Sequence, residues 1–182
     1  RDAFATAQYF LGYSVNSTDS AEWEQALELL MSQKPLVQAY VMDEVFNTME
    51  SGRAAMAPYY AGDYLTMAQD NEDLAFYIPK EGTNLFTDAM CIPKGAKHKT
   101  EAEMFINFMC ETDVGFSNAM ATGYSTPLNE VYALIQEDEE FSEYLPIAYP
   151  SDDVLNNTEV FVHLPEDVLS RMQELWIDIS FF

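Results

Sequence analysis

Residues Phe76–Pro127 read FYIPKEGTNLFTDAMCIPKGAKHKTEAEMFINFMCETDVGFSNAMATGYSTP, and this stretch decides the fold. Its apolar run from Leu85 to Ile92 has the length of a buried strand and contains a single acid, Asp88. A carboxylate in such a strand is costly unless a partner compensates its charge, and no basic residue lies beside it. We expect that partner to be the ammonium group of a ligand; the alternative is hydrogen bonding to nearby backbone N–H groups.

Working outward, short apolar runs alternate with amphipathic segments, which favours an α/β fold over an antiparallel sandwich. Capping patterns at Asp19 and Thr100 open two helices, and Gly12, Pro35 and Gly123 mark helix ends. Predicted helices cover 2–11, 20–34, 44–51, 63–69, 100–109, 113–122, 128–135 and a segment beginning at Pro165, and predicted strands cover 36–42, 54–59, 74–78 and 85–92. Residues 146–158 are expected to form a loop. The helix after Thr100 is expected to bury Met104, Phe105, Phe108 and Met109.

The composition restricts the class of partner. The 182 residues carry a net charge of -23, so the surface repels nucleic acid and anionic lipid and attracts cations. Most of these acids are explained by a solvated surface. No apolar run is long enough to cross a membrane. The chain starts without Met and without a signal peptide, so we expect a piece of a longer protein or a trimmed mature chain.

Signatures of common enzymes and cofactor sites are absent. The sequence has no Gly-x-Ser-x-Gly elbow, no phosphate-cradling loop and no Cys/His spacing for zinc. Residues 70–73 read DNED but lack the spacing and glycine of a calcium loop. We therefore predict no enzyme, no metal and no cofactor, and a two-carboxylate enzyme is the least favoured alternative. Cys91 and Cys110 are expected to be small buried hydrophobes, with a disulfide left open.

Two sequence features suit a cationic ligand. Tyr59 and Tyr60 lie at the end of a predicted strand, and Phe86 precedes Asp88 by two positions. Residues at i and i+2 of a strand point to the same side, so this ring and carboxylate would face one cleft. A carboxylate with aromatic faces attracts alkylammonium groups, with about 0.5–2 kcal/mol from each cation–π contact. The tyrosines could equally be ordinary core and rim aromatics.

Several motifs together resemble the spermidine/putrescine-binding proteins of bacterial ABC transporters. They are Pro79-Lys80-Glu81-Gly82, Phe86-Thr87-Asp88 with Ile92-Pro93, Ile106-Asn107-Phe108, and Gly123-Tyr124-Ser125-Thr126-Pro127. The resemblance covers most of residues 1–129. It implies an α/β fold that is part of a two-lobed class II periplasmic-binding-protein fold, with mixed sheets flanked by helices. It also implies a second-lobe segment at 1–85, a return segment of the first lobe at 86–134, and a C-terminal helical segment at 135–182 that packs on the second lobe.

The resemblance also implies site residues. Asp88 matches the family's ammonium-binding Asp, Phe86 and Tyr59 match two of its Trp residues, and Asp2 matches the second acid of an acidic pair. Phe161 falls near the family's Gln, beside Glu159; these two and Tyr60 are the weaker candidates. Tyr and Phe in place of Trp leave a cation-binding cage with a weaker attraction, so the choice of amine stays open.

As function, the resemblance implies an extracytoplasmic solute-binding component that binds polyamines and delivers them to a membrane permease. The expected location is periplasmic, or extracellular and membrane-anchored by a lipid or a fused permease. The alternatives are a binding protein for another cationic or small solute, and a sensor or interaction module of the same fold.

Overall fold

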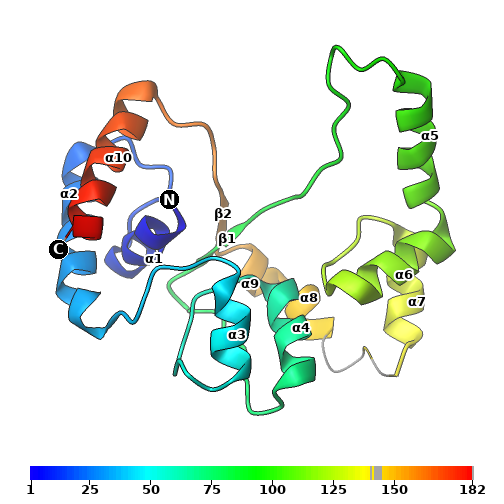
Figure 1. The fold of residues 1–182 in the computed structure, drawn as a ribbon, viewed down its shortest axis with the longest axis horizontal. Helices are drawn as coiled ribbons and strands as arrows, with labels where there is room; N and C mark the ends of the chain where they lie inside the picture. The colour runs from blue at the N-terminus through cyan, green and yellow to red at the C-terminus, as the bar shows by residue number, and fades with distance from the viewer. Residues whose placement is uncertain (140, 142–144, 182) are drawn as a thin grey trace. The chain divides into compact units, whose positions relative to one another are not determined.

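The computed structural model describes residues 1–139, 141 and 145–181. Figure 1 shows a helix-rich chain with one small sheet among these residues. The elements are α1 (Asp2–Leu11), α2 (Ser20–Gln33), the 3-10 helix η1 (Lys34–Leu36), α3 (Glu44–Glu50), α4 (Ala61–Asp70), β1 (Thr83–Leu85), α5 (Lys99–Met109), α6 (Thr112–Thr122), α7 (Asn129–Glu137), α8 (Leu145–Ala148), α9 (Asp152–Leu155), β2 (Thr158–Val160) and α10 (Glu166–Phe181).

The chain divides into two compact units. Unit 1 comprises residues 1–40, 77–87 and 152–182, and unit 2 comprises residues 41–76 and 88–151. Each unit therefore combines segments that are distant in sequence. The assignment of 1–85, 86–134 and 135–182 to the lobes of a longer protein stays a prediction.

The core of unit 1 lies between α1, α2 and α10. Phe4 and Trp23 meet edge to face with ring centroids 5.4 Å apart, a favoured aromatic geometry. Figure 1 shows α10 beside α2. Burial of these helix faces supplies most of the stabilisation of unit 1; the buried set is Phe4, Ala7, Trp23, Ala26, Leu30, Leu164, Val168, Leu175 and Ile179.

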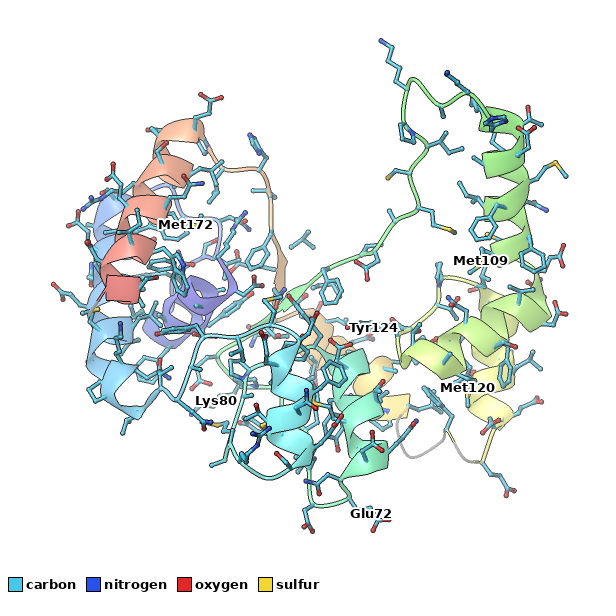
Figure 2. All side chains as sticks on the ribbon, in the orientation of Figure 1. Glu72, Lys80, Met109, Met120, Tyr124 and Met172 are labelled. Carbon is cyan, nitrogen blue, oxygen red and sulfur yellow. The ribbon has the colours of Figure 1, made fainter. Side chains whose placement is uncertain are left out.

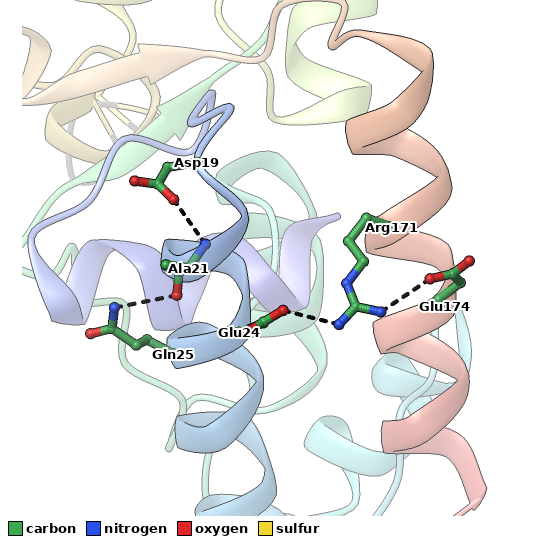
Figure 3. A network of polar contacts seen from close by, with 6 residues as sticks. All are labelled: Asp19, Ala21, Glu24, Gln25, Arg171 and Glu174. Carbon is green, nitrogen blue, oxygen red and sulfur yellow. Dashed lines mark hydrogen bonds and ion pairs between the residues drawn. The ribbon is translucent and has the colours of Figure 1, made fainter.

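Polar contacts fix the start and the outer side of α2 (Figure 3). The Asp19 side chain accepts a hydrogen bond of 2.8 Å from the Ala21 N–H, which satisfies one of the free amides at a helix start. The Arg171 guanidinium of α10 forms ion pairs of 3.1 Å with Glu24 of α2 and Glu174 of α10. This bridge is exposed, so it orients the two helices more than it stabilises them.

The sheet of unit 1 is a parallel pair. Thr83, Asn84 and Leu85 of β1 oppose Thr158, Glu159 and Val160 of β2. The chain therefore leaves both strands at the same end of the sheet, at residues 86 and 161.

The core of unit 2 lies between α4, α6 and α7 and the segment after α7. Gly62 and Gly123 allow α4 to meet the end of α6, because a Cβ on Gly123 would lie 2.8 Å from the Gly62 carbonyl oxygen. Gly123 also ends α6 with φ of 71°, a conformation that favours glycine. The buried set is Leu65, Ala119, Val131, Ile135 and Phe141.

The predicted helices are confirmed to within a few residues, whereas most predicted strands are wrong. Residues 36–42, 54–59 and 74–78 form no strand, and of 85–92 only Leu85 lies in one. The predicted loop at 146–158 contains α9 and parts of α8 and β2. A strand needs a neighbouring strand for its backbone groups, and within the described residues only 83–85 and 158–160 supply one to each other.

Two burial predictions are also wrong for this chain. Helix α5 buries none of its residues, and Met104 and Phe105 are 67% and 57% exposed. Cys91 and Cys110 are both exposed and free thiols. Within the described part of the chain, α5 and the two cysteines beside it keep their side chains at least partly exposed. Among the described residues, no helix combines the length and apolar character needed to span a bilayer.

Candidate ligand-binding site

Two predicted aromatic residues of the site lie just before α4 in unit 2. The Tyr59 and Tyr60 rings are tilted against each other with centroids 5.1 Å apart, and Phe46 of α3 meets Tyr59 edge-on at 6.0 Å. Burial raises the pKa of Tyr59, and the carboxylates Asp63 and Asp43 raise it further. The tyrosine pair is therefore held next to negative charge.

The larger of these two charge effects on the pKa of Tyr59 comes from Asp63, in the first turn of α4. The Tyr124 hydroxyl donates a hydrogen bond to the Asp63 carboxylate. Partial burial raises the pKa of Asp63 above its ordinary value, and Asp43 and Asp88 raise it further. Tyr124, labelled in Figure 2, follows α6, and its pKa is raised by burial and by Asp63. The first turn of α4 and the segment after α6 are thus joined by one polar contact.

Asp88 belongs to unit 2 and lies on an exposed segment without regular structure. The expected buried strand around it is therefore wrong for this chain. Its charge nevertheless acts on both Asp63 and Tyr124. Asp43 and Asp88 thus both act on Asp63, and these three residues form the acidic group of unit 2; the charge of Asp63 in turn raises the pKa of Tyr59 and Tyr124.

The remaining predicted residues lie in unit 1. Phe86 directly follows β1, and Phe161 directly follows β2. Because the strands are parallel and in register, both phenylalanines lie at the carboxyl end of the pair, the end at which α/β proteins commonly bind ligands. The Arg1 guanidinium lies over the Phe161 ring, 4.5 Å from its centroid.

The acids of unit 1 differ in their surroundings. Asp2 is exposed at the start of α1. Glu159 is engaged within the unit: its carboxylate accepts hydrogen bonds from the Ser14 hydroxyl and, at 3.3 Å, from the Val15 N–H. An acid held in this way has less capacity left for a ligand than Asp2.

Within unit 2 the structure brings Tyr59 against Tyr60 and lets Asp88 act on Asp63 and Tyr124, and within unit 1 Phe86 and Phe161 share one end of the sheet. Sequence reasoning missed Asp43, Asp63 and Tyr124. Asp63 was considered only as the start of a predicted helix, and Tyr124 only as part of the family motif Gly123-Tyr124-Ser125-Thr126-Pro127. Proximity to the tyrosine pair and Asp88 depends on tertiary packing, for which neither pattern is a signal.

The acidic group of unit 2 is not arranged as a metal centre. Among the described residues, no group of three or more His, Cys, Asp or Glu side chains could hold a metal ion. Phenol rings beside carboxylates suit an organic cation, since the rings offer cation–π attraction and the carboxylates offer charge.

Comparisons with solved structures define the class of protein. A Listeria monocytogenes protein assigned to a spermidine/putrescine ABC transporter matches 99% of this chain with a TM-score of 0.88 and 35% identity. The spermidine/putrescine ABC transporter substrate-binding protein from Streptococcus pneumoniae matches 98% with a TM-score of 0.84 and 30% identity. The chain is an α/β part of a periplasmic-binding-protein fold, which confirms the predicted fold class.

The sequence comparisons give the family. The profile of the bacterial extracellular solute-binding proteins matches residues 1–145, and the chain belongs to this family. Among curated relatives, the spermidine/putrescine-binding periplasmic protein 1 of Haemophilus influenzae is 30% identical over 95% of the chain. The putrescine-binding periplasmic protein SpuD of Pseudomonas aeruginosa is 28% identical over 96%. The family consists of solute-binding proteins rather than enzymes.

The chain spans about half the length of these relatives: 46% of the Haemophilus protein, 48% of the Pseudomonas protein and 55% of each solved structure.

Proposed function

We propose that the protein containing this chain binds linear polyamines, with spermidine and putrescine as the first candidates. The observation that carries the proposal is the group of carboxylates and tyrosines in unit 2. Asp43, Asp63 and Asp88 interact electrostatically there, and none of the ion pairs among the described residues includes any of them. A ligand that brings positive charge would relieve the repulsion between Asp63 and the other two carboxylates.

The chemistry favours an alkylammonium over a metal ion. The tyrosine rings lie within the reach of the same carboxylates, and ring faces attract a cation most when water is excluded. A linear amine also presents methylene groups that pack against rings. The names of the relatives, spermidine/putrescine-binding and putrescine-binding proteins, support this ligand class.

In the intact protein, we propose that Asp88 and Tyr59 contact the ligand, with Asp63 and Tyr124 beside them and Asp2, Phe86 and Phe161 as unit 1 candidates. The protein would act outside the cytoplasm, either in the periplasm or anchored on the outer side of the membrane, and would deliver the amine to an ABC permease without catalysing a reaction. Its net charge of -23 would also attract polycations over a distance set by the salt concentration.

The test is titration calorimetry of the full-length protein with spermidine, putrescine and the uncharged analogue 1,4-butanediol. We expect both amines to bind and the diol to fail, because the diol lacks the charge that the carboxylates compensate. Asp88→Asn should weaken amine binding by about tenfold or more, which corresponds to about 1.4 kcal/mol or more.

Asp70→Asn is the matched control. Asp70 is the exposed last residue of α4, so the variant removes the same charge outside the acidic group and should bind like the wild type. Undiminished binding by Asp88→Asn would overturn the role of Asp88. Binding of a different cation in a thermal-shift screen, with neither amine bound, would favour the alternative solute.

A further inference from the structure

One asparagine in unit 1 makes an unusual number of contacts with the segment that follows β2. The Asn16 Nδ2 group donates to the Val160 carbonyl at 2.9 Å, and its Oδ1 accepts from the Val162 N–H at 2.9 Å. Asn16 lies in the loop between α1 and α2. The two contacts bracket Phe161, so a single side chain fixes the backbone on both sides of that ring.

This arrangement imitates a neighbouring strand. In a parallel sheet, a residue of one strand accepts a hydrogen bond from an N–H of the neighbouring strand and donates one to a carbonyl of that strand, two residues apart. An asparagine side-chain amide carries both an acceptor and a donor. Beyond Val160, where the pairing of β1 with β2 ends, the Asn16 side chain takes over. The segment is thereby held in place without a third strand.

Charged side chains complete the network. The Arg1 guanidinium donates to Asn16 Oδ1 at 2.7 Å and to the Val162 carbonyl at 2.7 Å. Asn16 Nδ2 also lies 3.5 Å from a carboxylate oxygen of Glu159, and the same carboxylate accepts from the Ser14 hydroxyl. The loop of residues 14–16, the start of α1 and the end of β2 are thus joined through one amide.

We propose that Asn16 is a positioning residue for Phe161, the aromatic candidate for amine binding in unit 1, an inference that rests on the proposed function. It acts through the segment 160–162, which carries Phe161, and through Arg1, the residue next to Asp2. The uncharged Asn16 side chain contributes by fixing the position of the Phe161 ring beside α1.

The first test compares Asn16→Ala with Asn157→Ala in the full-length protein. Asn157 is a matched control because its side chain donates to the Lys80 carbonyl at 2.9 Å and so holds the opposite end of the β1–β2 pair. We expect Asn16→Ala to weaken putrescine binding about threefold to tenfold and to speed hydrogen exchange of the Val162 amide. Asn157→Ala should leave the affinity within twofold of the wild type.

The second test uses Asn16→Asp, which keeps the acceptor for Arg1 and Val162 but loses the donor for Val160. The new carboxylate would face Glu159 and the Val160 carbonyl, opposed by Arg1, with Ser14 and Tyr9 as the other polar groups around Glu159. Protonation restores a donor. The ratio of variant to wild-type affinity should therefore rise as the pH is lowered from about 7.5 to 5, a response that a loss of packing alone would not produce.

The outcomes separate the two proposals. If the wild type binds no amine, the proposed function fails and the role of Asn16 in amine binding fails with it. If the wild type binds and Asn16→Ala binds equally well, or Asn157→Ala is equally impaired, the positioning role alone is overturned. A pH-independent affinity ratio for Asn16→Asp would also contradict it.

Discussion

At the scale of single residues, Gly62 shows how one missing side chain sets the position of a site residue. A Cβ built on Gly62 would lie 2.5 Å from the Tyr124 ring, closer than carbon atoms can approach. The ring covers the start of α4 because residue 62 has no side chain. Tyr124 can therefore reach Asp63 in the same turn of helix.

Gly62→Ala should displace Tyr124 and lower the free energy of unfolding by about 1–3 kcal/mol, the usual cost of overpacking. Urea unfolding measures this change. Gly95→Ala is the control, since nothing lies within 4 Å of a Cβ at that position. Equal stability of the two variants would show that Tyr124 moves aside at little cost.

Asp63 should give the protein a recognisable pH dependence. Its folded-state pKa is raised, mainly by burial, so the native state binds this proton more tightly than the unfolded state does. Stability contributed by this group therefore falls as the pH rises through the window above its ordinary value near 3.8 and is constant at higher pH.

Unfolding free energies of the wild type and Asp63→Asn, measured between pH 4 and 8, test this prediction. The variant should lose the decrease in stability with rising pH that Asp63 causes, and it should gain relative to the wild type as the pH rises. Asp70→Asn, at the other end of α4, should leave that dependence in place. Parallel curves for the wild type and Asp63→Asn would contradict the assignment.

At the scale of elements, the C-terminal end of α10 is capped by a residue outside the helix. The last turn of α10 has no basic residue, and the Lys34 ammonium of η1 donates to the Ile179 carbonyl in that turn. A cation at a helix C-terminus stabilises the helix dipole and satisfies a free carbonyl.

Lys34→Met, which keeps the apolar stem, should lower the free energy of unfolding by about 1–2 kcal/mol, the sum of a charge-assisted hydrogen bond and the dipole interaction. The loss should shrink in high salt. Lys80→Met, an exposed lysine (Figure 2), serves as the control and should change stability little. An unchanged midpoint for Lys34→Met would remove Lys34 from the cap of α10.

Local and non-local elements differ in how well the sequence predicted them. Asp19 and Gly123 act on their own helix ends, so the predicted boundaries of α2 and α6 agree with the structure to within a few residues. The strand predictions at 36–42, 54–59 and 74–78 used only apolar character, and the described residues offer them no neighbouring strand. For the site, Tyr59, Tyr60 and Asp88 could be proposed from the sequence, whereas Asp63 and Tyr124 required the packing of α4 against the end of α6.

At the scale of the whole molecule, α5 shows what the chain leaves uncovered. Its apolar side chains Met104, Phe105 and Phe108 are exposed, and the chain spans about half the length of its relatives. An apolar helix face of this kind marks a surface that another part of a protein covers. We propose that the remainder of the longer fold covers it.

The substitution Phe108→Glu tests this proposal when it is made both in the isolated chain and in the full-length protein. In the isolated chain the change should alter the free energy of unfolding by no more than about 0.5 kcal/mol, as for surface sites. In the full-length protein it should cost about 2 kcal/mol or more, because a charge would be buried. Lys94→Glu, in the exposed turn before α5, controls for added negative charge. Equal effects of Phe108→Glu in both proteins would show that α5 stays uncovered.

The way the chain alternates between the two units has a consequence for its synthesis. Unit 1 uses three segments and unit 2 uses two, so the chain passes between them four times. The core of unit 1 joins Phe4 and Trp23 to Leu175 and Ile179 of α10, whereas unit 2 is complete at residue 151. During translation, the last residue of unit 2 is therefore synthesised before the last segment of unit 1. The apolar faces of α1 and α2 stay exposed until α10 has been synthesised. During that interval the exposed apolar faces of α1 and α2 make the nascent chain prone to aggregation and to binding by chaperones.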